Sequence, residues 1–413
     1  MLNAPASEEL IDSRYAAWRL LITLCLVTLG SSCMYVVAVV LPPAQAEFGI
    51  SRANASLPYT LMMICLGLGG VWTGKLADRI GISPVLWIGS VAILAGFVVA
   101  GLAPNIWVFG LAHGLLLGLL GSSATFAPLM ADTSLWWNKR RGVAVAICAS
   151  GNYVAGAVWP LLAQWGIESI GWRNTYIAMG VFCGVCMALL SFAMRQRPPL
   201  AITRATKTNA ISSSFSSSTP FGLQIGRAQI LLCIAGFSCC VAMAMPQVHI
   251  VAYCGDLGYG AARGAQMLSL MLTCGIVSRL LSGWICDRIG GVSTLLLGSA
   301  LQGIALLLFL PFKGLVPLYI ISGMFGLFQG GIVPSYAIIV REHFPPNEAG
   351  ARVGAVIMAT LIGMAAGGWL SGKIFDMTGS YQAAFLNGLA WNLLNLSISL
   401  WLFWRLRSKN PQT

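Results

Sequence analysis

A short motif that occurs twice, each time between two long apolar segments, constrains this chain more than any other feature. The pattern Gly-x-x-x-Asp-Arg-Ile-Gly spans residues 74–81 and returns at residues 283–290, 209 positions later in a chain of 413 residues. Because this spacing is about half of the chain, the motif indicates two tandem copies of one structural unit. The apolar flanks indicate that each unit lies in an apolar environment.

The composition identifies that environment as a lipid bilayer. Hydrophobic residues make up 57% of the chain and charged residues only 9%, whereas a soluble domain would expose far more charge. We count twelve stretches of about twenty residues with few charges, each long enough to cross a membrane. We expect helices, because a lipid-exposed backbone must satisfy its hydrogen bonds internally. The stretches lie near residues 18–43, 57–77, 84–104, 106–131, 142–163, 175–194, 228–252, 265–286, 292–311, 316–340, 352–372 and 383–404.

One long polar stretch divides these segments into two sets of six. Residues 195–227 carry basic side chains around a serine-rich run, and such a composition cannot bury a core. We therefore expect an all-α membrane protein with a six-helix bundle over residues 1–194, a linker over 195–227 and a second six-helix bundle over 228–413.

The net charge of +12 reflects orientation in the membrane and does not indicate nucleic-acid binding. With a cytoplasmic N-terminus, eighteen of the 24 Lys and Arg residues fall in cytoplasmic segments and five in outer loops. This asymmetry predicts that both termini are cytoplasmic. Residues 1–17 are polar and the first apolar run is long enough to span, so we expect no cleavable signal peptide. Tryptophans such as Trp136 and Trp137 are expected at the membrane interfaces.

The chain carries no pattern typical of an enzyme or of a cofactor site. No Gly-x-x-x-x-Gly-Lys-Ser/Thr loop is present in the sequence, which argues against transport driven by ATP. The twelve cysteines lie almost all within the spans, and we interpret them as small packing residues. The three histidines have no metal-ligand spacing. We expect no cofactor and no metal.

The repeated motif is similar to the signature loop of the major facilitator superfamily, which lies between the second and third spans. The resemblance covers essentially the whole chain. It implies twelve transmembrane helices in two pseudo-symmetric halves, with a substrate site at the interface between them. It also implies alternating access, in which the site opens to one side of the membrane at a time.

The same resemblance gives a role to the charged pairs of the motif. In the superfamily the Asp and Arg of this loop form a cytoplasmic latch that favours one access state; the matching residues are Asp78 and Arg79, with Asp287 and Arg288 in the second copy. A paired Asp and Arg at a helix end can favour one arrangement of helices. The alternative is that these residues are solvated charges at ordinary turns.

Four shorter segments resemble the monocarboxylate and oxalate/formate branch of the superfamily. They are residues 47–52 after the first span, residues 171–173 before the sixth, residues 248–258 at the end of the seventh, and Arg279 in the eighth, where the branch carries its substrate-binding arginine. One turn before this arginine, where animal members usually carry an acidic residue, this chain has Gly275. The resemblance implies a small organic anion, a mono- or dicarboxylate, as substrate.

Arg279 indicates an anionic substrate independently of the resemblance. A guanidinium stays protonated wherever it lies, and a charge within the bilayer is costly unless it is paired. The acidic residues lie in loops, in the N-terminal tail or at span ends, as do Asp132, Glu168 and Asp287. A carboxylate from outside would suit an unpaired arginine. The alternative is that Arg279 extends toward the cytoplasm, where Asp287 lies about 12 Å further along the helix.

Histidines and polar residues within the spans supply further candidates. His113 in the fourth span and His249 near the outer end of the seventh could each couple a proton to transport, or could satisfy a carbonyl. Most polar side chains in spans bond helices together. As substrate-contacting residues we predict Arg279, Asn152, Tyr153, His249 and Tyr336.

Together these features predict a secondary active transporter for a small organic anion, driven by protons or by exchange. The expected partners are the substrate, the lipid bilayer and protons, and a monomer is sufficient. The nearest alternative is an exporter of drugs or other hydrophobic compounds, which would favour an acid within the membrane. Short tails and the finer motifs resemble bacterial members, which implies the inner membrane.

Overall fold

All regular elements in the described part of the chain are helices. The computed structural model describes residues 10–196, 220–345 and 348–409. Within these residues, twelve segments are helical, long and apolar enough to cross a membrane. The protein is therefore an all-α integral membrane protein, and the predicted number of transmembrane helices is confirmed.

The first six spans, which we call the first half, contain the elements α1 to α9. Two spans are composite: α1 and α2 form the first, and α5, η2, α6 and α7 form the fourth. Element η2 is a π-helix, which is wound more widely than an α-helix. The elements are α1 (Arg14–Gly30), α2 (Ser32–Phe48), α3 (Arg52–Ile80), α4 (Ile82–Gly101), α5 (Ile106–Leu111), η2 (Ala112–Ser122), α6 (Ser123–Thr125), α7 (Ala127–Leu135), α8 (Arg141–Ile170) and α9 (Trp172–Ala193).

The second half contains the elements from η3 to α17, with α14 and α15 forming one span. They are η3 (Pro220–Gly222), α11 (Ile225–Asp256), α12 (Ala261–Ile289), α13 (Gly291–Leu308), α14 (Leu315–Gln329), α15 (Ile332–His343), α16 (Ala349–Thr378) and α17 (Tyr381–Lys409). Most of the predicted linker, residues 197–219, lies outside the described residues. The domain boundaries at 194/195 and 227/228 therefore stay a prediction.

The two copies of the repeated motif end their helices in the same way. Gly81 follows α3 with φ 91° and ψ 166°, and Gly290 follows α12 with φ 80° and ψ 165°. Glycine is the residue that adopts a positive φ of this kind without steric cost. Each glycine N–H donates to a carbonyl four residues earlier, that of Ala77 or Cys286, at 2.8 Å. The last glycine of the motif is explained by the turn into the next helix.

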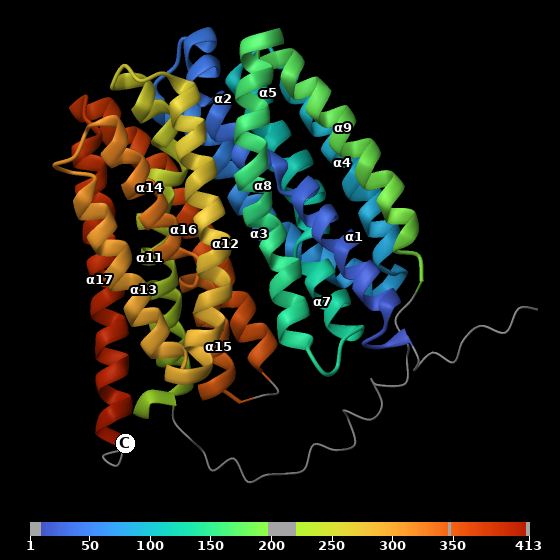
Figure 1. The fold of residues 1–413 in the computed structure, drawn as a ribbon, viewed down its shortest axis with the longest axis vertical. Coiled ribbons are helices and arrows are strands. Elements are labelled where there is room, and N and C mark those ends of the chain that lie inside the picture. Colours follow the sequence, from blue (N-terminus) through green and yellow to red (C-terminus); the bar gives the residue numbers. More distant parts are fainter. Residues whose placement is uncertain (1–9, 197–219, 346–347, 410–413) are drawn as a thin grey trace, which may run out of the picture.

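Figure 1 shows the two halves as two groups of long helices that lie side by side. They contact each other through α3 with α16, α8 with α12, and α2 with α11, and we call these contacts the inter-half interface. Helix α11 is buried without interruption from Ser238 to Cys254, so it faces protein on all sides there. In Figure 1, α1 and α11 begin at the end of the molecule where α17 finishes; we call this the linker end and its opposite the far end.

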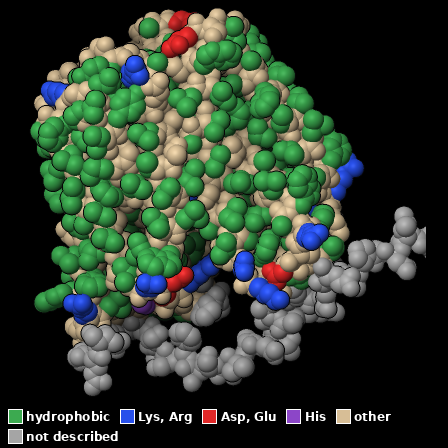
Figure 2. Space-filling model, viewed as in Figure 1, with side chains coloured by type: hydrophobic (Ala, Val, Ile, Leu, Met, Phe, Trp, Pro, Cys, Tyr) green, Lys and Arg blue, Asp and Glu red, His purple; other side chains and the backbone are tan. Residues whose placement is uncertain are grey.

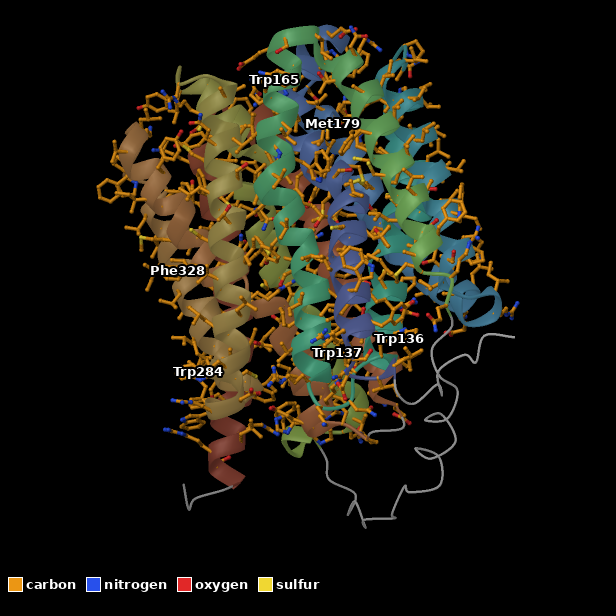
Figure 3. All side chains as sticks on the ribbon, turned by 45° about the vertical axis from the view of Figure 1, so that its right-hand side comes forward. Trp136, Trp137, Trp165, Met179, Trp284 and Phe328 are labelled. Atoms are coloured by element: carbon orange, nitrogen blue, oxygen red, sulfur yellow. The ribbon has the colours of Figure 1, made fainter. Side chains whose placement is uncertain are left out.

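Some tryptophans lie at the two ends of the lipid-facing surface, whereas Trp136, Trp159 and Trp172 are buried. Trp165 is 70% exposed and Trp284 is 55% exposed, and Figure 3 shows them at opposite ends of the molecule. Such positions are typical of the two membrane interfaces. The expectation for Trp136 is wrong: its side chain is buried, and its ring lies 4.5 Å from the guanidinium carbon of Arg19. The contact with a buried cation keeps this ring inside the first half.

Candidate functional site

The far end of the inter-half interface is closed around the side chain of Arg52, at the start of α3. Its Nη2 donates to Asp256 Oδ1 at 3.2 Å and its Nη1 donates to the Tyr381 hydroxyl at 2.9 Å. Asp256 ends α11 and Tyr381 begins α17, so one side chain of the first half binds two helices of the second. Arg52 is only 8% exposed, which makes these bonds less screened than a surface ion pair.

A second carboxylate of the second half binds the backbone at the same place. The backbone N–H groups of Arg52 and Ala53 each donate to a different oxygen of Asp376, both at 2.8 Å. Asp376 thus caps the first turn of α3 from α16, and its negative charge faces the positive end of that helix. Close packing adds to this contact, because a Cβ added at Gly372 would lie 2.9 Å from the Ala53 Cα.

His249 contacts Tyr381 of this group of side chains and is completely buried. Its Nε2 lies 2.8 Å from the carbonyl oxygen of Gly368, and its Nδ1 lies 3.3 Å from the hydroxyl of Tyr381. The histidine is therefore linked to Arg52 through one shared tyrosine. We call Arg52, Asp256, Asp376, Tyr381 and His249 the far-end cluster.

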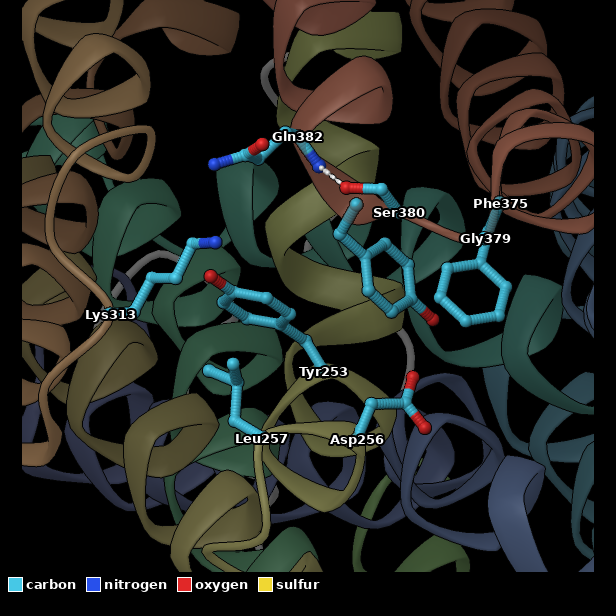
Figure 4. Close-up of a pocket in the computed structure, with 9 residues that line it drawn as sticks. Tyr253, Asp256, Leu257, Lys313, Phe375, Gly379, Ser380 and Gln382 are labelled. Atoms are coloured by element: carbon cyan, nitrogen blue, oxygen red, sulfur yellow. Dashed lines mark hydrogen bonds between the residues drawn. The ribbon is translucent and has the colours of Figure 1, made fainter.

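A small pocket of about 200 Å³ lies beside the far-end cluster. Figure 4 shows its lining, in which Tyr253 and Asp256 come from α11 and the side chain of Lys313 points toward the hydroxyl of Tyr253. Lys313 is exposed in the connection before α14. The pocket is an open depression at the far end, and it gives the cluster a solvent-facing side.

The middle of the inter-half interface is occupied by Arg279 of α12. Its Nη1 donates to the Ala149 carbonyl of α8 at 3.0 Å, and its guanidinium carbon lies 4.5 Å from the centroid of the Tyr153 ring. Its Nε has no hydrogen-bond partner among the described residues. The structure brings together two predicted site residues, Arg279 and Tyr153, from opposite halves.

Gly275 makes this contact possible. A Cβ added at Gly275 would lie 2.4 Å from Cε1 and 2.5 Å from Cδ1 of Tyr153, closer than real Cβ contacts allow. The aromatic ring therefore uses the space that a side chain at position 275, one turn before Arg279, would fill. The arginine is held by a ring face and a carbonyl, and the described residues form five ion pairs that do not include it.

Two more polar groups lie on the interface helices of the first half. The Tyr35 hydroxyl on α2 donates to Asn152 Oδ1 at 2.6 Å. The hydroxyl of Tyr59, on α3, is buried and has no hydrogen-bond partner within the described ranges. A buried hydroxyl of this kind is costly unless it finds a partner.

The linker end of the inter-half interface is open by comparison. A Cβ added at Gly142 of α8, Gly283 of α12 or Gly354 of α16 would meet no described atom within 4 Å. Figure 2 shows the surface hollowed between the two halves toward this end. The interface helices are thus in contact at the far end and in the middle, and they separate toward the linker end.

The predicted latch residues lie at this open end. Asp78, Arg79, Asp287 and Arg288 are all exposed, and none belongs to an ion pair of the described residues. Arg288 lies over the ring of Trp284, 3.8 Å from its centroid. The latch role stays a prediction.

The remaining predicted residues lie inside one half each. His113 is completely buried in the first half, with Nδ1 2.8 Å from the Phe109 carbonyl and Nε2 3.2 Å from the Tyr176 hydroxyl. Tyr336 is buried in the second half, and its hydroxyl donates to Asn395 Oδ1 at 2.8 Å. Both side chains have partners within their own half, and their predicted functional roles are not tested by these contacts.

Sequence reasoning found His249 but missed the other residues of the far-end cluster, and it missed a buried ion pair inside the first half. It treated Arg52 as an outer-loop charge, although an arginine at a helix start can pair with Asp256 and Asp376 at helix ends on the same side. Arg19 and Asp132 form a buried pair within the first half at 2.9 Å. Both pairings join residues more than a hundred positions apart, which helix periodicity alone cannot detect.

Comparisons with known proteins identify the family. The family model of the Major Facilitator Superfamily matches residues 20–325 and, in a second match, residues 267–413. The chain belongs to the major facilitator superfamily, and it is a membrane transporter. This confirms the resemblance seen in the repeated motif.

Individual relatives are distant but cover most of the chain. Monocarboxylate transporter 13 of Rattus norvegicus is 27% identical over 348 residues, which cover 83% of this chain and 78% of that protein. The uncharacterized MFS-type transporter YcxA of Bacillus subtilis is 27% identical over 352 residues and 83% of each chain. Among solved structures, the nucleoside transporter NupG matches with a TM-score of 0.71 at 12% identity, over 93% of this chain and 100% of that one. The structural match supports the fold alone.

Proposed function

We propose that this protein carries a small monocarboxylate across the membrane and that Arg279 binds the carboxylate at the inter-half interface. The guanidinium of Arg279 carries the proposal, because it bridges the halves, keeps Nε free and lies outside the ion pairs of the described residues. Relatives named monocarboxylate transporters, at 24–27% identity, support the same substrate class.

One positive charge without a counter-charge suits a substrate with one carboxylate. Arg279 is partly buried, and the two arginines that are buried among the described residues are already paired, Arg19 with Asp132 and Arg52 with Asp256. A monocarboxylate at Arg279 would neutralise the remaining charge, whereas a dicarboxylate would leave a negative charge inside the membrane. This reasoning narrows the predicted mono- or dicarboxylate to a monocarboxylate.

The aromatic surroundings suit this role. Tyr153 binds the face of the guanidinium and leaves its edge available, and a planar carboxylate accepts hydrogen bonds from such an edge. Asn152 accepts a hydrogen bond from the Tyr35 hydroxyl, so its role in this proposal is to hold Tyr35 in place.

Alternating access would follow if the substrate carboxylate and the Ala149 carbonyl compete for the Arg279 guanidinium. We assign the linker end to the cytoplasm and the far end to the outside, on the basis of the predicted charge asymmetry. The structure then corresponds to a state that is open to the cytoplasm. A carboxylate that takes the place of the Ala149 carbonyl at Arg279 would release α8 from α12 and favour a different arrangement of the halves.

Thermal stability of the purified protein tests the binding step. A ligand that binds the folded state raises the melting temperature as its concentration exceeds its dissociation constant. We expect acetate, lactate or pyruvate to stabilise the protein more than oxalate or succinate, and the effect to be absent in Arg279→Ala. Arg263→Ala is the matched control, since Arg263 lies on the same helix and is exposed at the far end.

Two results would overturn the proposal. One is equal stabilisation of Arg279→Ala and the unaltered protein by the same carboxylate. The other is stabilisation by hydrophobic or cationic compounds and by no carboxylate, which would favour the alternative of a drug exporter.

A further inference from the structure

The far-end cluster contains a titratable group that the binding of a carboxylate does not use. We propose that His249 is a proton-binding site that competes with Arg52 for the hydroxyl of Tyr381, so that acid on the outer side favours opening of the outer end. The inference rests on the proposed function only for the assignment of the far end to the outside.

The hydrogen bonds of the closed cluster require a neutral histidine. The Tyr381 oxygen accepts from Arg52 Nη1, so its single proton is free to be donated to His249 Nδ1, at 3.3 Å. The other ring nitrogen, Nε2, then carries the proton that is donated to the Gly368 carbonyl. With this tautomer every polar atom of the histidine and of the tyrosine hydroxyl has a partner.

A protonated His249 does not fit the closed cluster. Its Nδ1–H would point at the Tyr381 oxygen, and the tyrosine proton would lose its acceptor. Two cations, the imidazolium and the Arg52 guanidinium, would then share one hydroxyl oxygen in a buried place. Burial of an unsatisfied donor and of like charges side by side is unfavourable. Closure of the outer end therefore expels the proton.

Opening of the outer end favours protonated His249 over the neutral form. Two charged groups act on the imidazole: Arg52 belongs to the first half, and Asp376 comes from α16 of the second. Asp256 ends the helix that carries His249. When the halves separate there, both carboxylates stay on the second half with the histidine and the arginine leaves. Asp376 without the opposing guanidinium favours the imidazolium, and water then reaches Nδ1 from the outer side.

The other neighbours of His249 do not alter this reasoning. Helix α12 meets α11 near the cluster through Gly264 against Val251, a contact without charge. Helix α17 contributes Tyr381, whose hydroxyl is shared with Arg52. Lys313 lies in the adjoining pocket but is exposed, so solvent screens its charge.

The first half offers a matched control. His113 is also completely buried and also lies beside a tyrosine hydroxyl, that of Tyr176, at 3.2 Å. That pair lies within one half, and no arginine of the other half binds its tyrosine within the described residues. A proton at His113 would therefore leave the inter-half interface unchanged.

Hydrogen–deuterium exchange at the start of α3 tests the proposal directly. The backbone N–H groups of Arg52 and Ala53 are bonded to Asp376 only while the outer end is closed. The protein would be placed in phospholipid nanodiscs without substrate, and a peptide over residues 48–60 followed at pH 5.5 and 7.5. Labelling times would be adjusted for the intrinsic pH dependence of exchange.

We expect faster corrected exchange at pH 5.5, by up to about tenfold per pH unit for one linked proton. His249→Gln should lose this response and His113→Gln should keep it. Tyr381→Phe should exchange faster at pH 7.5 as well, because Arg52 loses its acceptor. These variants are compared only if they melt cooperatively, and Tyr381→Phe provides a second route if His249→Gln does not fold.

The proposal is wrong if the unaltered protein shows no corrected pH response, or if His249→Gln responds as the unaltered protein does. Neither result depends on a substrate. Failure here would therefore leave carboxylate binding at Arg279 untouched, and failure of the thermal-stability test would leave the exchange result valid.

Discussion

The two ends of the inter-half interface use their charged side chains in opposite ways. At the far end, two carboxylates of the second half join the buried guanidinium and the backbone of Arg52 in the first half, although both carboxylates are themselves exposed. At the linker end, Asp78, Arg79, Asp287 and Arg288 are exposed and belong to none of the ion pairs of the described residues. The motif that is most visible in the sequence is therefore not the set of charges that holds the halves together in this state.

This difference indicates how a few contacts can set the state of a transporter. The two halves keep their internal packing, and the balance between arrangements depends on the contacts made at either end. Arg279, in the middle, bonds α12 to α8 and is the place where the proposed substrate would alter the balance. Substitutions at the two ends, in the middle and inside one half should therefore differ in their effects on melting temperature, hydrogen exchange and carboxylate binding.

The largest effect is expected from a buried pair that lies away from the interface. Arg19→Ala would leave Asp132 buried without its bidentate partner, and loss of one member of a buried pair costs about 3–5 kcal/mol of stability. We expect a strong drop in melting temperature. Exchange at residues 48–60 should keep its pH response, and loss of that response would show that the pair is coupled to the interface.

A somewhat smaller effect, with a different signature, is expected from Arg52→Ala. It removes the ion pair to Asp256 and the bond to Tyr381, and loss of a hydrogen-bonded buried charge costs about 2–5 kcal/mol. Here the closed arrangement should be lost, and the start of α3 should exchange rapidly at every pH. Arg173→Ala is the control, because Arg173 pairs with Glu47 at the same end but within the first half, where both side chains are partly exposed. Equal effects of the two variants would contradict a special role for the far-end cluster.

A third prediction concerns the middle of the interface. Gly275→Ala places a methyl group against the Tyr153 ring, and overpacking of this kind costs about 1–3 kcal/mol. Tyr153 should move off the guanidinium, so binding of a monocarboxylate should weaken while the fold persists. Calorimetric titration with the stabilising carboxylate would measure this. Unchanged affinity would mean that Tyr153 does not position Arg279.

The smallest effect is expected from Asp376→Asn. The amide oxygen can still accept one backbone N–H of α3, but the charge at the helix start is lost, which is worth about 0.3–1 kcal/mol. Exchange at residues 48–60 should rise slightly. The pH response should also shrink, because the carboxylate that favours protonated His249 is gone; a larger response than in the unaltered protein would contradict the proposed charge balance.

The fold could be predicted from the sequence because its determinants are local. Long apolar segments and the repeated glycine motif fix the spans, and Gly81 and Gly290 adopt the same conformation because each copy of the motif makes the same turn. The far-end cluster could not be predicted in this way. Arg52, Asp256 and Asp376 read as ordinary charges at helix ends, and only the packing of α3 against α16 and α11 brings them together.

The proposed substrate site falls between these two cases. Arg279 stands out in the sequence because a charge inside a span needs an explanation. Its partners do not stand out, because a tyrosine in a span is common and Gly275 shows its meaning only when the ring of Tyr153 lies on it. Residues that act through one other side chain are recognised from three-dimensional contact and seldom from sequence.

Uptake into liposomes is the most direct test of carboxylate transport through Arg279. Purified protein would be reconstituted, and entry of radiolabelled lactate, pyruvate, oxalate and succinate followed for the unaltered protein, Arg279→Ala, Arg279→Lys and Arg263→Ala. We expect uptake of a monocarboxylate by the unaltered protein and by Arg263→Ala, and loss of about 30-fold or more in both Arg279 variants, because removal of a charged binding partner costs about 2–5 kcal/mol and lysine lacks the planar edge. Uptake by Arg279→Ala at the rate of the unaltered protein would contradict the central claim.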